Sequence, residues 1–437
     1  MTNFFSQFVS QFLTSLIGVV FMFTGMKSGT TGQETKTPGD FTPVLRFIVC
    51  SDIHLDGKEN QEAAVRMKNL FADMYAYGEN SDYKNLDAFL VAGDFTGGGR
   101  ENEYRMFNKI IEENMKSSTQ LITVLGNHEF IEYRDVDATV GYDVYKKFIN
   151  ENVDTHVVIN GYHFIGVSYD DDGKSFTKKM VWLDQELAKA TKDDPSKPVF
   201  VINHPHPTLT VYGSVNWSDM SLRTVLNKYP QVVDFSGHSH YAPSDPRSVW
   251  QGEFTAVGCG SLSAFMGNLN YIEGDKDAPG KSGGAWLVEC DAQGNVSMKL
   301  YDIENRMFFG NIDYYFTNLS NSSKRTYNWH KQKSLDTAPL FPENAVISGI
   351  KENDEVVISF PEARGYYEAE NYKIKVTDSK NKTVFEQTVI SEYVRATDDD
   401  VRVSLGNLSA GEYTVKVDSY SPYAMHGQQL KNTITVE

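Results

Sequence analysis

The sequence predicts an α/β domain followed by an all-β sandwich domain. From Val44 to about residue 304, short apolar runs alternate with segments of helical spacing, which is typical of a layered α/β domain. After about residue 343 the helical segments stop, and short strands follow one another at the spacing of a β-sandwich. A chain of 437 residues, 40% of them hydrophobic, is long enough for two or three domains.

The N-terminal segment predicts export. Residues 1–26 carry no charged side chain, and the run FLTSLIGVVFMF within them resembles the apolar part of a signal peptide. We interpret residues 1–26 as a signal peptide or membrane anchor, with an exposed amphipathic helix as the alternative, and residues 27–42 as a flexible tether. The protein is therefore expected to be periplasmic, secreted or anchored in the cell envelope, with any membrane association made through its N-terminus.

Residues 43–304 are expected to form the first domain. Its predicted strands are VLRFIVC, LDAFLVAG, QLITVLG, THVVIN, YHFIGVS, PVFVIN, QVVDFSG, FTAVGCG, GAWLVEC and VSMKLYDI. Helical spacing predicts helices at 60–77, 101–114, 142–149, 178–190 and 218–229. The dipeptide Asn160-Gly161 lies between two of the strands, so it predicts a β-hairpin.

The remaining residues predict a connector and a sandwich. Residues 305–342 are rich in aromatic residues and punctuated by Asn, Ser and Pro, which indicates an irregular connector packed on the first domain. Residues 343–437 contain the strands EVVISF, NYKIKVTD, KTVFEQTVI, VRVSLGNL, EYTVKVDSY and NTITVE. The segment LGNLSAGEYTVKVDS resembles the tyrosine corner of fibronectin type III domains, with Tyr413 as the corner. This resemblance implies a fibronectin type III or immunoglobulin-like β-sandwich.

Charge and cysteine content exclude several classes. A net charge of -17 argues against general binding of nucleic acids, although bound metal ions can reverse the local sign for a phosphorylated substrate. Cys50, Cys259 and Cys290 show no zinc-site spacing. We therefore expect neither a zinc finger nor a disulfide framework.

Five predicted strands end in side chains that can bind metal. The sequence motifs at these ends, in chain order, are D-x-H, G-D, G-N-H-E, H and G-H-x-H. Each motif alone fits a turn or a helix cap. Because the carboxyl ends of parallel strands converge at one edge of a sheet, the five together indicate a single metal site. Their residues are Asp52, His54, Asp94, Asn127, His128, Glu129, His204, His206, His238 and His240.

This order of motifs resembles the calcineurin-like metallophosphoesterase family over about residues 44–304. The resemblance implies a four-layer β-sandwich flanked by helices, with two metal ions at one edge. It implies three ligands for each ion and one carboxylate shared by both. The three sets are Asp52, His54 and His240; Asn127, His204 and His238; and Asp94. His128 is implied to lie beside the substrate phosphoryl group and to bind no metal.

The chemistry of these residue types agrees with that resemblance. Two divalent ions roughly 3.5–4 Å apart can hold a bridging hydroxide, which would attack phosphorus. His128 would stabilise the transferring group or protonate the leaving oxygen, an effect of roughly 10²–10⁴-fold in rate. Imidazole and amide ligands favour manganese, iron or zinc over calcium. Asn127, His128 and His206 are candidate substrate-binding residues; a surface position in a Pro-fixed turn is the alternative for His206.

Two differences from the motifs of known subfamilies argue against membership of those subfamilies. Leu125 precedes the G-N-H-E motif and FTGGGR follows Asp94, whereas protein Ser/Thr phosphatases usually have Arg and V-D-R-G at these places. Purple acid phosphatases have Tyr three residues after the G-D aspartate, and this chain has Gly97 there. A protein phosphatase and a tyrosinate-bound ferric ion are therefore both disfavoured.

Several other residues have open roles. Glu129 either orients His128 or caps the next segment. Arg100 and Arg134 are interpreted as solvated, and the DDDG turn at 170–173 and the acidic run at 398–400 as solvated loops. Loop aromatics either stack on a base or sugar or merely cover the loops; they are Tyr133, Tyr212, Trp217 and Tyr241. Four histidines match no motif and are interpreted as structural or solvated, namely His156, His163, His330 and His426.

Taken together, the sequence predicts an exported dinuclear-metal phosphoesterase acting on a small phosphomonoester or phosphodiester. One alternative is a phosphodiesterase of cyclic nucleotides or lipid head groups, because the ligand set does not separate these substrates. Another is a cell-envelope binding protein in which the metal site is vestigial.

Overall fold

A computed structural model describes residues 36–263, 283–325 and 327–437. The predicted signal peptide or anchor at 1–26, and most of the predicted tether at 27–42, lie outside these residues. Within the described parts of the chain, no helix is both long enough and apolar enough to cross a membrane.

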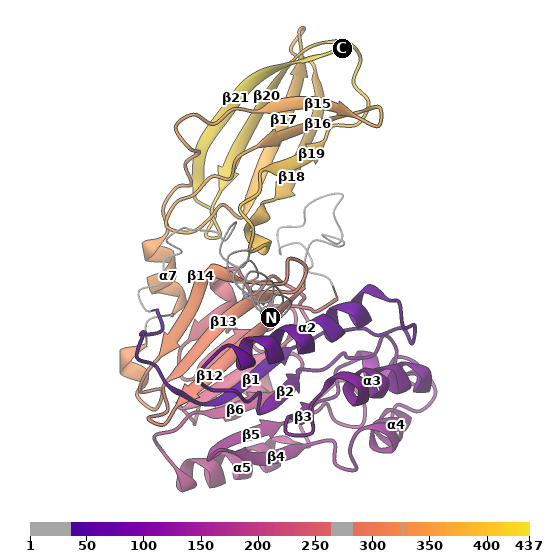
Figure 1. Cartoon of the computed structure of the whole chain (residues 1–437), viewed down its shortest axis with the longest axis vertical. Coiled ribbons are helices and arrows are strands. Elements are labelled where there is room, and N and C mark those ends of the chain that lie inside the picture. Colours follow the sequence, from indigo (N-terminus) through magenta and orange to yellow (C-terminus); the bar gives the residue numbers. More distant parts are fainter. Residues whose placement is uncertain (1–35, 264–282, 326) are drawn as a thin grey trace, which may run out of the picture.

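Two six-stranded sheets form the first domain (Figure 1). The first has the order β14-β13-β12-β1-β2-β3, and the second has the order β10-β11-β9-β6-β5-β4. The strands of the first sheet are β1 (Pro43–Cys50), β2 (Ala88–Val91), β3 (Gln120–Thr123), β12 (Gly284–Asp291), β13 (Val296–Asp302) and β14 (Met307–Phe316). Those of the second are β4 (Thr155–Ile159), β5 (Tyr162–Gly166), β6 (Val199–Ile202), β9 (Val232–Ser236), β10 (Val249–Gln251) and β11 (Thr255–Gly258).

Aromatic side chains fill the space between the two sheets. Phe47 of β1 lies 4.7 Å from Phe200 and 5.1 Å from Phe164, both from the second sheet, measured between ring centroids. All three rings are fully buried. Face-to-face packing of this kind, with inward apolar side chains from both sheets, is the core of a β-sandwich.

Helices cover the outer faces and complete four layers. On the first sheet, Phe71 of α2 (Glu62–Glu79) packs 4.7 Å from Phe89 of β2. Helix α3 (Glu101–Asn114) lies beside α2, and α4 (Val140–Phe148) lies beside α3 (Figure 1). On the second sheet, α5 (Met180–Asp193) contacts β5, β6 and α6 (Met220–Leu226). The predicted layered α/β fold is confirmed.

Strand polarity decides where the site forms. β1, β2 and β3 run parallel, and so do β5, β6, β9 and β11. The predicted hairpin of β4 and β5 is also present, and Asn160 and Gly161 take φ of 51° and 77°, as a type I′ turn requires. Because the parallel strands end on the same side, the polar segments that follow them meet at one edge.

The segment 305–342 was predicted to be irregular, and this is wrong for its first part. Strand β14 pairs with β13 and extends the first sheet. Four of its apolar side chains are buried, namely Phe309, Ile312, Tyr314 and Phe316, and the last three of them alternate along the strand. A register irregularity against β13 and the polar residues within the strand hide this period-two pattern in the sequence. Farther along, α7 (Trp329–Leu335) also lies in the predicted connector.

The C-terminal strands form two further sheets. One has the order β15-β16-β19 and the other β18-β17-β20-β21. The strands are β15 (Ser348–Glu352), β16 (Glu355–Phe360), β17 (Asn371–Asp378), β18 (Thr383–Ile390), β19 (Val401–Ser404), β20 (Gly411–Tyr420) and β21 (His426–Val436). The Tyr413 hydroxyl donates to the carbonyl of Ser409 at 2.8 Å, as in a tyrosine corner. The all-β domain is confirmed, β15 was not predicted, and the fibronectin type III assignment stays a prediction.

A buried ion-pair network joins the two domains. Arg247, in the first domain, lies 2.5 Å from both Asp245 and Glu370, and its guanidinium stacks 3.7 Å above the ring of Tyr212. It also donates to the carbonyl of Pro422 at 2.5 Å. Glu370 and Pro422 belong to the C-terminal domain, so the network fixes that domain against the segment that contains residue 247.

A buried carboxyl in β9 gives a first prediction. Asp234 is fully buried and accepts a hydrogen bond from the side-chain amide of Asn203. Burial raises the pKa of Asp234 well above its usual value. The folded state therefore holds a proton that the unfolded state releases above about pH 4. The free energy of unfolding should then fall by about 1.4 kcal/mol per pH unit, until the pH passes the folded-state pKa.

Asp234→Asn should remove this pH dependence, because an amide of the same shape stays neutral. Urea unfolding between pH 6 and pH 8 should show the variant gaining stability relative to the wild type as the pH rises. Asp245→Asn is the matched control, since Asp245 is a charged partner of Arg247. It should lose stability throughout. Equal losses for both variants at every pH would contradict a neutral Asp234.

Candidate metal centre

The loops that carry the predicted ligands have an unusual backbone. Five of the seven predicted ligands have positive φ: Asp52 (53°), His54 (51°), Asp94 (50°), His238 (70°) and His240 (56°). For residues other than glycine this conformation costs about 1–3 kcal/mol each and persists only where the surroundings enforce it. Its concentration at one edge of the sandwich is typical of a functional site.

Two motif glycines permit the close approach of these loops. A Cβ atom on Gly126 would lie 2.1 Å from Asp94 Oδ1. One on Gly237 would lie 1.9 Å from Ser51 Oγ and 2.2 Å from Asp52 Oδ2. No side chain fits at such distances, so the glycines of G-N-H-E and G-H-x-H are needed for packing of the loops, independently of any turn.

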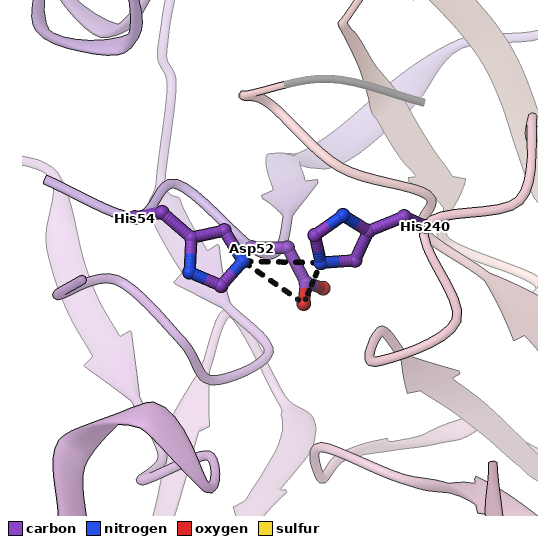
Figure 2. A group of neighbouring side chains, drawn as sticks. All are labelled: Asp52, His54 and His240. Carbon is purple, nitrogen blue, oxygen red and sulfur yellow. Dashed lines mark hydrogen bonds and ion pairs between the residues drawn. The ribbon is translucent and has the colours of Figure 1, made fainter. Parts of the chain in front are cut away.

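The first ligand cluster brings together Asp52, His54 and His240 (Figure 2). His240 Nε2 lies 2.9 Å from Asp52 Oδ1 and 3.0 Å from His54 Nε2. Asp52 Oδ2 accepts hydrogen bonds from Ser51 Oγ and from the backbone N–H of His238. Asp52 Oδ1 is buried and accepts none. Three lone-pair atoms thus converge on one point, an arrangement that suits a cation.

The second cluster brings together Asp94, His204 and His238, with Asn127 beside them. His204 Nε2 lies 3.1 Å from each of three ligand atoms, on Asp94, Asn127 and His238. His204 Nδ1 donates to the carbonyl of Ala92 at 2.8 Å. Because a carbonyl only accepts, the hydrogen of neutral His204 resides on Nδ1, which leaves Nε2 free to bind a metal.

The pKa values of His238 and His204 are shifted in opposite directions. Burial lowers the pKa of His238 to about 4, with a smaller contribution from the charge of His204. Burial also acts to lower the pKa of His204, but the charges of Asp94 and Asp52 outweigh it and raise the pKa to about 9. The carboxylates therefore attract positive charge to the position of His204 Nε2, as a metal site requires.

His128 lies at the solvent side of the clusters. Its Nδ1 donates to the carbonyl of Gly97 at 2.9 Å, and its ring lies 4.3 Å from that of His54. The side chain is 32% exposed, compared with 15% for His54 and 18% for His240. His128 Nε2 is 3.9 Å from Asp94 Oδ2. The ring is thus held by Nδ1, and Nε2 lies on the side of Asp94 in a side chain that is one-third exposed.

Neither predicted role of Glu129 is correct. Its carboxylate is fully buried and accepts four hydrogen bonds, from the backbone N–H groups of Asp94, Thr96 and Gly126 and from the Thr96 hydroxyl. Burial, with the charge of Asp94, raises the pKa of Glu129 to about 8. Glu129 therefore ties the loop of Asp94 to the loop of Asn127. Sequence spacing does not reveal this contact, because the two loops come from different strands.

Glu129→Gln should destabilise the protein by about 2–4 kcal/mol. The amide NH₂ group would face backbone N–H donors, and each buried donor left unpaired costs about 1–3 kcal/mol. Urea unfolding measures the loss. The neighbouring Glu132→Gln is a suitable control, because Glu132 makes an exposed ion pair with Arg100 at 2.8 Å. If both variants unfold at the same urea concentration, the tying role assigned to Glu129 is wrong.

Ser51 and Ser261 were not predicted and support the first cluster. Ser51 Oγ bonds to Asp52 Oδ2, and Ser261 Oγ donates to the backbone carbonyl of Asp52 at 2.8 Å. Ser51 directly precedes the D-x-H motif, so its proximity could have been noticed. Ser261 comes from a distant part of the chain, and only the fold brings it close.

His206 does not take either predicted position. It is 1% exposed, and its two ring nitrogens lie 2.8 Å from the hydroxyls of Ser236 and Ser239. Burial lowers the pKa of His206 to about 3, so the ring stays neutral. With both nitrogens engaged beneath the G-H-x-H loop, His206 supports the loop and is unavailable to a substrate.

The structure also places the loop aromatics, the two arginines and the DDDG turn whose roles were left open. Among the four loop aromatics, Trp217 contacts a predicted ligand, with its ring 5.0 Å from that of His238. Tyr212 and Tyr241 stack on each other at 4.7 Å, next to Arg247, and Tyr133 packs on the core. Arg100 pairs with Glu103 and Glu132, and Arg134 is exposed, as predicted. Asp170 of the DDDG turn is buried and was wrongly interpreted as solvated.

Comparison with known proteins shows what the domain that carries these clusters is similar to. Residues 45–242 match the family described as calcineurin-like phosphoesterase. A Caenorhabditis elegans protein, UPF0046 protein K07C11.7, is 25% identical over 229 residues, which are 49% of this chain and 70% of that protein. The match over residues 45–242 contains every residue of the two clusters.

Two solved structures are matched at low similarity. A purple acid phosphatase from yellow lupin (Lupinus luteus) seeds is 13% identical, with a TM-score of 0.46 over 68% of this chain and 56% of that chain. This chain thus spans little more than half of that enzyme's length. The FN1–FN3 domains of chicken CNTN1 are 11% identical, with a TM-score of 0.17 over 35% of this chain and 48% of that chain.

Proposed function

We propose, from the premise that residues 45–242 are a calcineurin-like, metal-dependent phosphoesterase domain, that this protein hydrolyses a small phosphomonoester or phosphodiester. The proposal includes two divalent ions, manganese, iron or zinc, held by the two clusters. The observation that carries it is the position of Asp94. A carboxylate oxygen of Asp94 lies within 4.8 Å of a ligand atom of His54 in the first cluster, and within 4.8 Å of ligand atoms of His204 and His238 in the second.

The residues present fit such a metal pair. Asp52 offers a buried oxygen that accepts no hydrogen bond, and the tautomer of His204 leaves Nε2 free. Two bound ions would activate a water molecule at neutral pH and would offset the negative charge of the phosphoryl group. Asp52, His54 and His240 would hold one ion, Asn127, His204 and His238 the other, and Asp94 both.

His128 is proposed to act on the substrate directly. Its Nδ1–H is fixed by the carbonyl of Gly97, so Nε2, which lies 3.9 Å from Asp94 Oδ2 at the edge of the clusters, is the nitrogen able to carry or donate a proton. Burial lowers the pKa of His128, so the protonated ring gives up its proton more easily. Asn127, beside His204, can donate its amide N–H to a phosphoryl oxygen while its oxygen faces the second cluster.

A paired assay tests the proposal. Purified protein stripped with a chelator and supplied with Mn²⁺ should hydrolyse p-nitrophenyl phosphate or bis(p-nitrophenyl) phosphate, and the chelated protein should not. The ratio of the two rates decides between monoesterase and diesterase activity. Absence of activity on both compounds with Mn²⁺, Fe²⁺ and Zn²⁺ would contradict the proposal and favour a binding protein with a vestigial site.

Export is part of the same proposal. It is supported by the uncharged, apolar character of residues 1–26. A chain tagged at its C-terminus should be recovered outside the cytoplasm or with the cell envelope after fractionation. Recovery in the cytosolic fraction alone would contradict it.

A further inference from the structure

A second group of histidines lies away from the metal centre. His156 is in the edge strand β4, His163 is in the adjacent strand β5, and Glu186 and Asp193 reach them from helix α5. His163 is level with Val199, the first residue of β6. The ligand His204 follows Val199 by five residues, or roughly 16 Å along an extended chain. The group is therefore at the opposite end of the sheet from the centre.

The four side chains form a continuous chain of contacts. Glu186 Oε2 lies 2.7 Å from His156 Nδ1. His156 Nε2 lies 2.8 Å from His163 Nδ1, and His163 Nε2 lies 3.0 Å from Asp193 Oδ2. The order is carboxylate, imidazole, imidazole, carboxylate, and all four ring nitrogens are used.

The number of hydrogens on the ring nitrogens limits how these four side chains can contact one another. The carboxylates only accept, so the outer nitrogens, His156 Nδ1 and His163 Nε2, both carry hydrogen. Two neutral imidazoles then have no hydrogen left for the inner nitrogens, whose lone pairs face each other at 2.8 Å. Such a pair needs either one additional proton between the rings or a cation that accepts both lone pairs.

The metal centre shows the same spacing between ring nitrogens. The inner distances there are 3.0 Å between His54 and His240 and 3.1 Å between His204 and His238. The outer contacts also agree with metal chemistry, since histidine ligands commonly donate their second N–H to a carboxylate or carbonyl. His204 does so with Ala92, as His156 and His163 do with Glu186 and Asp193.

We propose that His156 and His163 bind one transition-metal ion through Nε2 and Nδ1, respectively. Glu186 and Asp193 hold the two rings by accepting their outer N–H groups. The side chains of His156 and His163 are 15% and 10% exposed, so the ion has access from solvent, and water completes its coordination. Nitrogen ligands alone, with no carboxylate on the ion, favour Cu²⁺, Ni²⁺ or Zn²⁺ over Mn²⁺.

The scaffold presents the two rings in a fixed arrangement. The residues lie on the same face of a two-stranded hairpin, as diagonal neighbours across β4 and β5. The type I′ turn at Asn160-Gly161 sets the register of this hairpin. A second contact, from Lys189 to Glu186 at 2.5 Å, holds the carboxylate that orients His156.

Counting ions per chain tests this site separately from the phosphoesterase centre. Full-length protein is equilibrated with Zn²⁺, freed of loosely bound ions, and measured by elemental analysis. The wild type should retain one ion more than His163→Gln. His426→Gln, which removes an exposed histidine paired with Asp418, should match the wild type. Equal ion content in wild type and His163→Gln overturns the site and leaves only a shared proton between the rings.

A milder variant and a spectroscopic measurement distinguish loss of the metal site from misfolding of the protein. Glu186→Gln keeps both ligands and should weaken Zn²⁺ binding at this site by about 10–100-fold, as expected for loss of a carboxylate that orients a ligand. After two equivalents of Cu²⁺ have filled the phosphoesterase centre, a third equivalent should add an electron paramagnetic resonance signal with two nitrogen ligands, and this added signal should be lost in His163→Gln. An unchanged spectrum in that variant also overturns the site. Mn²⁺-dependent phosphoesterase activity should be the same in all three variants.

Discussion

Asp94→Asn should reduce phosphoesterase activity by roughly 10³-fold, the size expected when one preorganised electrostatic contribution is lost from an active site. Asp94 Oδ2 lies 3.1 Å from His204 Nε2, and Asp94 Oδ1 accepts the backbone N–H of His128 at 2.8 Å. Asparagine keeps the shape but removes the charge and one acceptor. Both the metal content and the position of His128 depend on this carboxylate, so kcat should fall and the Mn²⁺ requirement should rise.

Asp56→Asn is the matched control. Asp56 follows the D-x-H motif, only two residues after His54, yet its side chain is 39% exposed and pairs with Lys58 at 2.8 Å. The same change of charge near the same loop should alter activity by no more than about twofold, since exposed ion pairs contribute little. Comparable losses in both variants would mean that the general charge of this edge matters, and that Asp94 has no special position.

The sequence was sufficient to predict the strands that lead to the site. Apolar runs such as FIVC end abruptly in ligand-type residues, and the strand order places those ends together. It was also sufficient for the helices α2 and α3, whose buried faces have clear helical spacing. These features depend on residues that are close together in the sequence, so they can be predicted before the fold is known.

Features that depend on contacts between distant segments were not predicted. Glu129 binds backbone groups of another loop, and His206 is enclosed by two serines from beyond the next helix. The positive φ angles of five ligands arise because the loops are held on several sides at once. Strand β14 is recognisable only when its buried side chains are seen against β13. In each case the decisive partner lies far away in sequence.

Arg247→Met should destabilise the protein by about 3–5 kcal/mol, because it leaves two buried carboxylates without their cation. Asp245 is 0% exposed and Glu370 is 2% exposed, and both lie 2.5 Å from the guanidinium. Urea unfolding measures the loss. Arg402→Met is the control, since Arg402 pairs with Glu352 on the surface of the C-terminal domain with both side chains about half exposed. It should cost no more than about 1 kcal/mol.

The same substitution should also weaken metal binding, because the segment from His240 to Arg247 joins the first cluster to the domain interface. Ala242, two residues after His240, packs against Ile390, Tyr393 and Val394 of the C-terminal domain. Loosening this contact should raise the Mn²⁺ concentration needed for half-maximal activity in Arg247→Met and leave it unchanged in Arg402→Met. An Arg247→Met protein that is destabilised but has the wild-type Mn²⁺ requirement would show that the C-terminal domain stabilises the fold without supporting the ligand loop.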